Sequence, residues 1–249
     1  MSPTQTNVSP RRAAKDGAEE LADEHEPIMR ADGKYTAAFF DMDHTVLQLD
    51  TGVSYMKFSY RRGELAIKGL AEAVFWSLQY KLAILDLEAL ATKLCARGAG
   101  DSEEALIRKH RLWFESIARP AIAPEARKAI AEHRRRGDMI VLCTGAAQFP
   151  ANELATALDI EHVLSSRAEV VDGRFTGKVE SYCFGQHKLV RTEAFADVHN
   201  IDLDDSWFYS DSYNDLPLMN RVGTAIAVNP DARLRRHAWR RGWRTESWM

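Results

Sequence analysis

Four aspartates fall in two short acidic segments that lie far apart in the chain. Asp41 and Asp43 stand two residues apart in DMDHT, and Asp211 and Asp215 lie within YSDSYNDLP. Two carboxylates that meet in one site can divide the work, with one ionised and the other carrying a proton. So much negative charge in one place is costly unless a cation is bound. A site made only of oxygen ligands indicates a hard ion such as Mg²⁺.

Three other groups in the sequence suit a phosphate. Thr144, in LCTGA, offers a hydroxyl, and the backbone N–H of Gly145 follows it. Lys188, in GQHK, offers a positive charge for a phosphate oxygen. A carboxylate nucleophile, a hard metal ion, a hydroxyl and a lysine together are typical of phosphoryl transfer. The structural alternatives are a helix cap for Thr144 and a solvated helix lysine for Lys188.

The residues around these groups predict the elements that position them. The apolar run YTAAFF leads into Asp41, DMIVLCTG carries Thr144, and SWFYSDS leads into Asp211. Each run has the apolar, β-prone composition of a buried strand. Helical and strand patterns alternate after Pro120, which predicts an α/β fold: a Rossmann-like parallel sheet with helices on both faces. Ligands bind such sheets at the carboxyl ends of the strands, so we expect the three strand ends to form one site.

Local signals predict several further elements. Residues 124–136 read as a helix with a proline at its start and a glycine after its end. Residues 150–158 and 187–199 also read as helices. Asp172-Gly173 in EVVDGRFTG predicts a hairpin turn. After a strand in TAIAVNP, we expect the pair Asn229-Pro230 to cap a last helix in DARLRRHAWRRG.

The chain divides into three parts by pattern. Residues 1–33 are polar and charged, and we expect a disordered tail. Apolar residues recur at helical spacing from 51 to 117, which predicts an all-helical cap over 51–119. Residues 34–50 and 120–249 would then form the catalytic core.

The motifs resemble those of a known family. DMDHTV resembles the DxDxT signature of the haloacid dehalogenase (HAD) superfamily, and LCTGA, GQHK and YSDSYNDLP follow in the family's order. The helical insert resembles the cap of the phosphoserine-phosphatase-like branch, subfamily IB. This resemblance implies a Mg²⁺-dependent phosphatase that acts on a small phosphorylated metabolite through an aspartyl-phosphate intermediate.

The resemblance also implies a role for each motif residue. Asp41 would be the nucleophile, and Asp43 would act as the general acid and base. Metal binding would fall to Asp41, Asp43 through its backbone carbonyl, and Asp211, with Asp215 supporting the metal's waters or the lysine. Phosphate would contact Thr144, Gly145, Lys188 and Asn214.

Two positions depart from the family pattern. His44 stands where a small residue, often glycine or serine, is common. It either fills space or narrows the leaving-group side. Asp50 falls where phosphoserine phosphatases place a glutamate near the substrate amine. It either contacts substrate or caps the helix that begins near Thr51.

Composition narrows the other possibilities. The net charge of −3 does not indicate a protein that coats nucleic acid or an anionic membrane, and neither is expected as a partner. The three cysteines form no CxxC motif, so we expect reduced thiols rather than disulfides or a zinc site. No secretory or membrane-spanning segment is recognisable, which favours the cytoplasm. The alternatives left open are a phosphotransferase or mutase on the same fold, a non-catalytic binding module, and a lipid phosphatase. The oligomeric state stays open.

Overall fold

A seven-stranded sheet forms the centre of the protein, in a computed structural model that describes residues 26–81 and 86–248. The strand order is β4-β3-β2-β1-β5-β6-β7, and every neighbouring pair is parallel except β3 and β4. The strands are β1 (Ala37–Phe40), β2 (Met139–Ala147), β3 (His162–Val171), β4 (Arg174–Ser181), β5 (Trp207–Ser210), β6 (Thr224–Val228) and β7 (Arg244–Glu246). The predicted Rossmann-like fold is confirmed.

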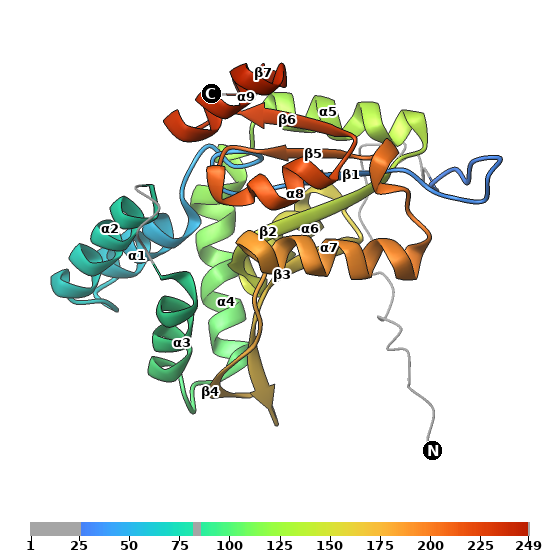
Figure 1. Cartoon of the computed structure of the whole chain (residues 1–249). Helices are drawn as coiled ribbons and strands as arrows, with labels where there is room; N and C mark the ends of the chain where they lie inside the picture. Colours follow the sequence, from blue (N-terminus) through green and yellow to red (C-terminus); the bar gives the residue numbers. More distant parts are fainter. Residues whose placement is uncertain (1–25, 82–85, 249) are drawn as a thin grey trace, which may run out of the picture.

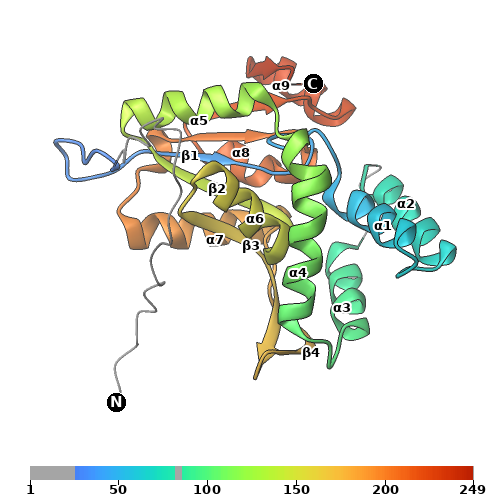
Figure 2. The same cartoon turned by 180° about the vertical axis from the view of Figure 1, so that it is seen from behind.

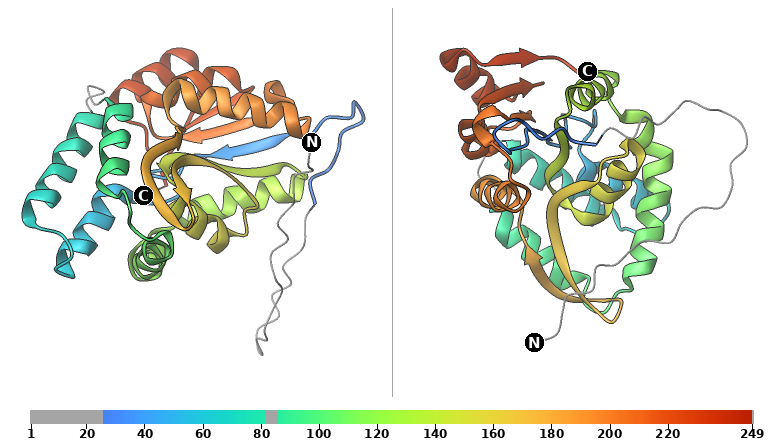
Figure 3. Two further views of the ribbon diagram at one scale, coloured as in Figure 1. Left: turned by 90° about the horizontal axis from the view of Figure 1, so that it is seen from below. Right: turned by 90° about the vertical axis from the view of Figure 1, so that its right-hand side faces the viewer.

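Helices cover both faces of this sheet, as the alternating pattern predicts. In Figure 1 the helices α7 (Gly185–His199) and α8 (Leu216–Arg221) lie in front of the strands. From behind, α5 (Pro124–Arg136) and α6 (Gln148–Leu158) lie in front instead (Figure 2). The view from below shows the sheet between two layers of helices (Figure 3, left). The last helix, α9 (Ala232–Arg241), packs Leu234 and Ala238 on the α7 side.

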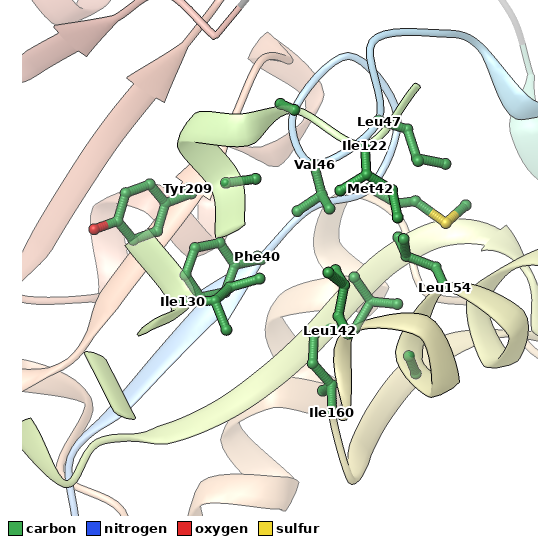
Figure 4. Close-up of a cluster of buried hydrophobic side chains, with 14 of the residues drawn as sticks. Phe40, Met42, Val46, Leu47, Ile122, Ile130, Leu142, Leu154, Ile160 and Tyr209 are labelled. Carbon is green, nitrogen blue, oxygen red and sulfur yellow. The ribbon is translucent and has the colours of Figure 1, made fainter. Parts of the chain in front are cut away.

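The two apolar layers follow from the alternation of side chains along each strand. In β1, Ala38 and Phe40 point into the cluster beneath α5 and α6, whereas Ala37 and Phe39 point into the one beneath α7 and α8. Figure 4 shows the first cluster around Phe40, whose ring stacks on Tyr209 at 4.6 Å. Since β1 is buried on both faces, its sequence AAFF is continuously apolar rather than alternating.

After β1 and the loop that follows it, the elements of the described chain are helices as far as α5. This segment contains α1 (Thr51–Arg61), α2 (Ile67–Lys81), α3 (Leu87–Arg97), α4 (Glu103–Trp113) and a π-helical turn at Phe114–Ala118. Helices α1, α2 and α3 lie together to one side of the sheet, and α4 runs from beside the β3–β4 hairpin back to the core, across the direction of the strands (Figure 1). Trp113 and Phe114, at the end of this segment, belong to the core cluster. None of the helices in the described residues is long and apolar enough to cross a membrane.

Most of the local predictions are confirmed. Helix α5 has Pro124 in its first turn and ends at Gly137, which has a φ of 79°. The hairpin turn between β3 and β4 has positive φ at both Asp172 (51°) and Gly173 (72°), as a type I′ turn requires. The antiparallel strand β4 is the product of that hairpin.

Two features of the C-terminal region differ from the prediction. The expectation that Asn229-Pro230 caps the last helix is wrong, because Asp231 is the capping residue and its Oδ1 accepts from the backbone N–H groups of Arg233 and Leu234. Strand β7 has only three residues, too few for a recognisable alternation, and the sequence pattern missed it.

The predicted tail lies mainly outside the described residues, which begin at 26. Its last part lies against the core. The backbone N–H of Ile28 donates to the Gly137 carbonyl at 2.9 Å, and Arg30 pairs with Asp205 at 2.5 Å.

Candidate active site

The three predicted strand ends lie at one edge of the sheet. Strands β1, β2 and β5 are neighbours and parallel, so their carboxyl ends point the same way. Asp41 directly follows β1, and its backbone N–H donates to the Tyr209 carbonyl of β5 at 2.9 Å. Asp211 directly follows β5, and Thr144 lies in the last part of β2. Parallel pairing thus brings residues from three distant parts of the chain together.

Lys188 lies at the centre of this site. It belongs to the first turns of α7 and is only 2% exposed. Its Nζ donates to Asp41 Oδ1 at 2.9 Å and to Asp215 Oδ2 at 2.7 Å. Burial lowers the pKa of Lys188, but Asp215 and Asp41 outweigh that effect and hold its pKa well above the ordinary value. The ammonium therefore stays charged and joins the two acidic motifs.

The carboxylates carry more negative charge than one lysine offsets. Burial raises the pKa of Asp41 to about 6, against the lowering influence of Lys188. Burial also raises the pKa of Asp211 well above its usual range, and the charges of Asp41 and Asp215 add to the rise. This excess of buried negative charge fits a divalent cation.

A cation at this site would have to keep part of its water shell. Among the described residues, no three acidic, histidine or cysteine side chains are arranged as a complete set of metal ligands. Mg²⁺ is commonly held by one or two carboxylates with waters in the remaining positions. Asp41 and Asp211 suit that role. Asp215 is more fully engaged than Asp41, since its Oδ2 accepts from both Lys188 and the Ser210 hydroxyl at 2.7 Å, whereas Asp41 Oδ1 accepts from Lys188.

Asp43 is held by the first residue of the helical segment. Thr51, at the start of α1, donates to Asp43 through its backbone N–H at 3.2 Å and its hydroxyl at 3.0 Å. Burial raises the pKa of Asp43 well above its usual range, and the nearby charges of Asp50 and Asp41 raise it further. A carboxyl group with a raised pKa keeps its proton closer to neutral pH, as a general acid requires.

The predicted phosphate donors lie where β2 approaches α7. Thr144 is 2% exposed, and its Oγ1 accepts from the backbone N–H of Ala146 at 3.1 Å. A Cβ at Gly145 would come within 3.3 Å of the Phe184 Cβ, so a side chain there would press on the loop before α7. Asn214 lies in the turn between Asp211 and α8, and its backbone N–H donates to the Ser212 hydroxyl at 3.2 Å.

His44 and Asp50 shape the loop after β1. His44 has a φ of 55°, in the left-handed region that favours glycine. Asp50 caps α1, since its Oδ1 accepts from the backbone N–H of Val53 at 2.8 Å. Its charge also acts on Asp43. Asp50 therefore caps the helix, and substrate contact by His44 or Asp50 stays a prediction.

Sequence reasoning missed two residues of this site. Thr51 appeared only as the start of a helix, and Ser210 only as part of a strand. Thr51 directly follows Asp50, and Ser210 directly precedes Asp211, so both hydroxyl residues stand beside acids that the sequence singles out. Nothing local in the sequence shows which carboxylate each one contacts.

Comparison with known proteins places the chain in a family. The model of the haloacid dehalogenase-like hydrolases matches residues 38–220, more than half of the chain. A solved structure from Bordetella pertussis Tohama I, described as a protein with unknown function, aligns with a TM-score of 0.78 at 30% identity, over 86% of this chain and 99% of that one. A phosphoserine phosphatase structure aligns with a TM-score of 0.65 at 20% identity, over 87% and 94%, and shows the same fold.

Two relatives carry the names of phosphatases. A Mycobacterium tuberculosis protein named as a phosphoserine phosphatase is 31% identical over 212 residues, which cover 83% of this chain and 69% of that protein. A Neisseria meningitidis protein named as a histidinol-phosphatase is 28% identical over 212 residues, covering 83% and 96%. The chain therefore belongs to the haloacid dehalogenase-like hydrolase family, and it is a phosphatase of that family.

Proposed function

We propose that this protein is a Mg²⁺-dependent phosphomonoester hydrolase that works through an aspartyl-phosphate on Asp41. The observation that carries the proposal is the buried Lys188, whose ammonium lies 2.9 Å from Asp41 Oδ1 and 2.7 Å from Asp215 Oδ2. A lysine that keeps its charge beside a carboxylate can draw in a phosphate oxygen while the carboxylate attacks phosphorus. A purely structural ion pair would not need the additional acids at the same sheet edge.

In the first step a carboxylate oxygen of Asp41 attacks phosphorus, and the bond from phosphorus to the ester oxygen breaks. Asp43 gives its proton to that oxygen, so the product leaves as a neutral alcohol. The raised pKa of Asp43 supports this role, because the carboxyl group must be protonated before the substrate reacts. At the end of the step Asp41 carries the phosphoryl group and Asp43 is ionised.

In the second step the ionised Asp43 takes a proton from a water molecule. The water oxygen attacks phosphorus, the acyl-phosphate bond breaks, and inorganic phosphate leaves. Asp41 is free again and Asp43 holds the proton it needs for the next cycle. The Thr51 bonds to Asp43 support both states, since they fix the carboxyl group in one orientation.

Binding groups for the phosphate and the metal come from the same edge of the sheet. In the proposal, the Thr144 hydroxyl, the Gly145 N–H, Lys188 and Asn214 contact the phosphate. Asp41, Asp211 and the Asp43 carbonyl hold Mg²⁺, and Asp215 orients Lys188. When bound, Mg²⁺ offsets the negative charge of the phosphate and of the buried acids.

The substrate class is inferred from the relatives and from the charge of Asp50. We propose a small phosphorylated metabolite, with an amino acid or amino alcohol phosphate as the leading class. Two relatives are named for phosphoserine and histidinol phosphate, which are esters of this kind. Asp50 places a negative charge near Asp43, where a substrate amine would be favoured.

The test is phosphate release from a panel of small phosphomonoesters, including p-nitrophenyl phosphate. Wild type and Asp41→Asn are each assayed with Mg²⁺ and with EDTA, after circular dichroism confirms that both fold. Turnover that needs both Mg²⁺ and Asp41 supports the proposal. Phosphate release by Asp41→Asn at the wild-type rate would contradict it. Phosphoryl transfer to an added alcohol in place of release would favour a phosphotransferase, and no reaction with any ester would favour a binding protein.

A further inference from the structure

The turn that follows β6 touches both loops of the active site. It consists of Asn229, Pro230 and Asp231, and we call it the β6–α9 turn. One of its side chains contacts the loop after β1, which carries Asp41 and Asp43. The other contacts the loop after β5, which carries Asp211. These contacts reach the backbone of the loops, so the influence of the turn on the reaction must pass through the loops.

Asn229 holds the first loop. Its Nδ2 donates to the backbone carbonyl of His44 at 2.8 Å, across 185 positions of sequence. Its Oδ1 accepts from the backbone N–H of Trp248 at 2.8 Å. Both Asn229 and His44 have positive φ, 44° and 55°. A backbone in this region persists only when its surroundings hold it there, and here the two left-handed residues are bonded to each other.

Asp231 holds the second loop. Its backbone N–H donates to the Asp211 carbonyl at 2.9 Å, and its Oδ2 accepts from the Tyr213 N–H at 2.8 Å. The other oxygen, Oδ1, caps α9. The guanidinium of Arg233 lies over the Tyr213 ring, 4.3 Å from its centroid. The start of α9 is thus fastened to the backbone on both sides of Ser212.

We propose that the β6–α9 turn is a positioning clamp that sets the separation of the two acidic loops, with Asn229 holding the first and Asp231 the second. This inference rests on the proposed function, since it assigns the clamp to the metal-holding acids. Asp41 is buried and Asp211 is half-buried, and the two carboxylates repel each other when both are ionised. The clamp acts on the backbone of each loop, at the His44 carbonyl and at the Asp211 carbonyl and Tyr213 N–H, and so holds the two carboxylates in register.

Two neutral or isosteric variants test the clamp. Asn229→Gly keeps the positive φ and removes the bonds to the His44 carbonyl and from the Trp248 N–H. Asp231→Asn keeps the helix cap, because asparagine caps as well as aspartate, and turns an NH₂ group towards the Tyr213 N–H. The matched control is Asn200→Gly. Asn200 also has positive φ (54°) and also donates from Nδ2 to a backbone carbonyl, that of Gly33, in the N-terminal segment rather than in either acidic loop.

Three readouts separate positioning from general support of the fold. The first is amide hydrogen exchange of metal-free protein, which we expect to quicken over residues 41–49 in Asn229→Gly and over 211–215 in Asp231→Asn. The second is the Mg²⁺ concentration that gives half of the maximal Tm shift, expected to rise about tenfold, the size typical for residues that orient metal ligands. The third is kcat on p-nitrophenyl phosphate, expected to fall by about tenfold with little change in KM.

The outcomes are distinct. If Asn229→Gly and Asp231→Asn lower Tm as Asn200→Gly does, but leave loop exchange, Mg²⁺ response and kcat within about twofold of wild type, the clamp is refuted and the turn only supports the fold. If wild type itself shows no Mg²⁺ response, the proposed function fails, and the clamp, which positions metal-holding acids, falls with it. Faster loop exchange in the two variants, together with a weakened Mg²⁺ response, supports the clamp.

Discussion

Removing the hydroxyl of Thr51 should change the pH dependence of catalysis without touching a reacting group. The Thr51 hydroxyl donates to Asp43 Oδ2 at 3.0 Å and lowers the pKa of a carboxyl group that burial raises. Thr51→Val keeps the shape of the side chain and the backbone bond to Oδ1, and loses only the hydroxyl bond. The ionised form of Asp43 then becomes less stable, so the carboxyl group holds its proton to higher pH.

The expected size follows from the strength of that bond. A hydrogen bond to a charged group contributes about 1.5–3 kcal/mol. Because one pH unit corresponds to about 1.4 kcal/mol, the alkaline limb of kcat/KM should move up by about 1–2 pH units. This alkaline limb reports the loss of the proton that Asp43 gives to the leaving alcohol. The shift should therefore appear with alkyl phosphates, whose leaving alcohol needs that proton.

The assay is kcat/KM against pH for the best alkyl phosphate of the panel, at saturating Mg²⁺. Thr51→Ser is the matched control, because serine retains the hydroxyl. With p-nitrophenyl phosphate, whose leaving group needs little protonation, the limb should be weak in every variant. The reasoning is refuted if Thr51→Val leaves the limb within about 0.3 pH units of wild type, or if Thr51→Ser moves it equally.

Two further predictions concern the charges of the site. Lys188→Met leaves Asp41 and Asp215 buried without their cation, so the metal-free protein should lose about 3–5 kcal/mol of unfolding free energy, measured in urea. The control Lys128→Met, at an exposed position, should change the unfolding free energy by less than about 0.5 kcal/mol. An equal loss in both variants would contradict the role of burial. The folded metal-free protein keeps protons on Asp41 (pKa about 6, ordinary value 3.8) and Asp211 that the unfolded chain has lost, so its stability should fall as pH rises through this range. Mg²⁺ should offset that loss, and its effect on Tm in calorimetry should be larger at about pH 7.5 than at about pH 5, whereas equal shifts would argue against a cation among these acids.

Much of the fold was determined by signals that act over a few residues. Pro124 and Gly137 mark the two ends of α5. Proline suits the first turn of a helix, and glycine readily adopts the left-handed conformation that follows the last helical residue. Asp172 and Gly173 specify the hairpin for a similar reason. These preferences belong to the local backbone, so they can be recognised without knowing what packs around them.

The meeting of the acidic motifs was also predictable, though less directly. An apolar run ahead of Asp41, of Thr144 and of Asp211 implies three buried strands, and parallel strands in an α/β fold present their carboxyl ends at one edge. The strand pairing confirms that these ends are neighbours. The topology alone therefore predicts that these groups meet at one edge of the sheet.

Only the tertiary structure decided how those groups are held. The bond from Thr51 to Asp43, the Ser210 contact with Asp215 and the bridge from Asn229 to the His44 carbonyl each depend on the path of a loop. A hydroxyl or an amide has many possible partners, and its own sequence neighbours do not choose among them. Burial then sets the energies, since the same carboxylates in water would keep their ordinary pKa. Residue types and spacing thus determined which chemical groups are available here, and long-range packing determined which atoms come together.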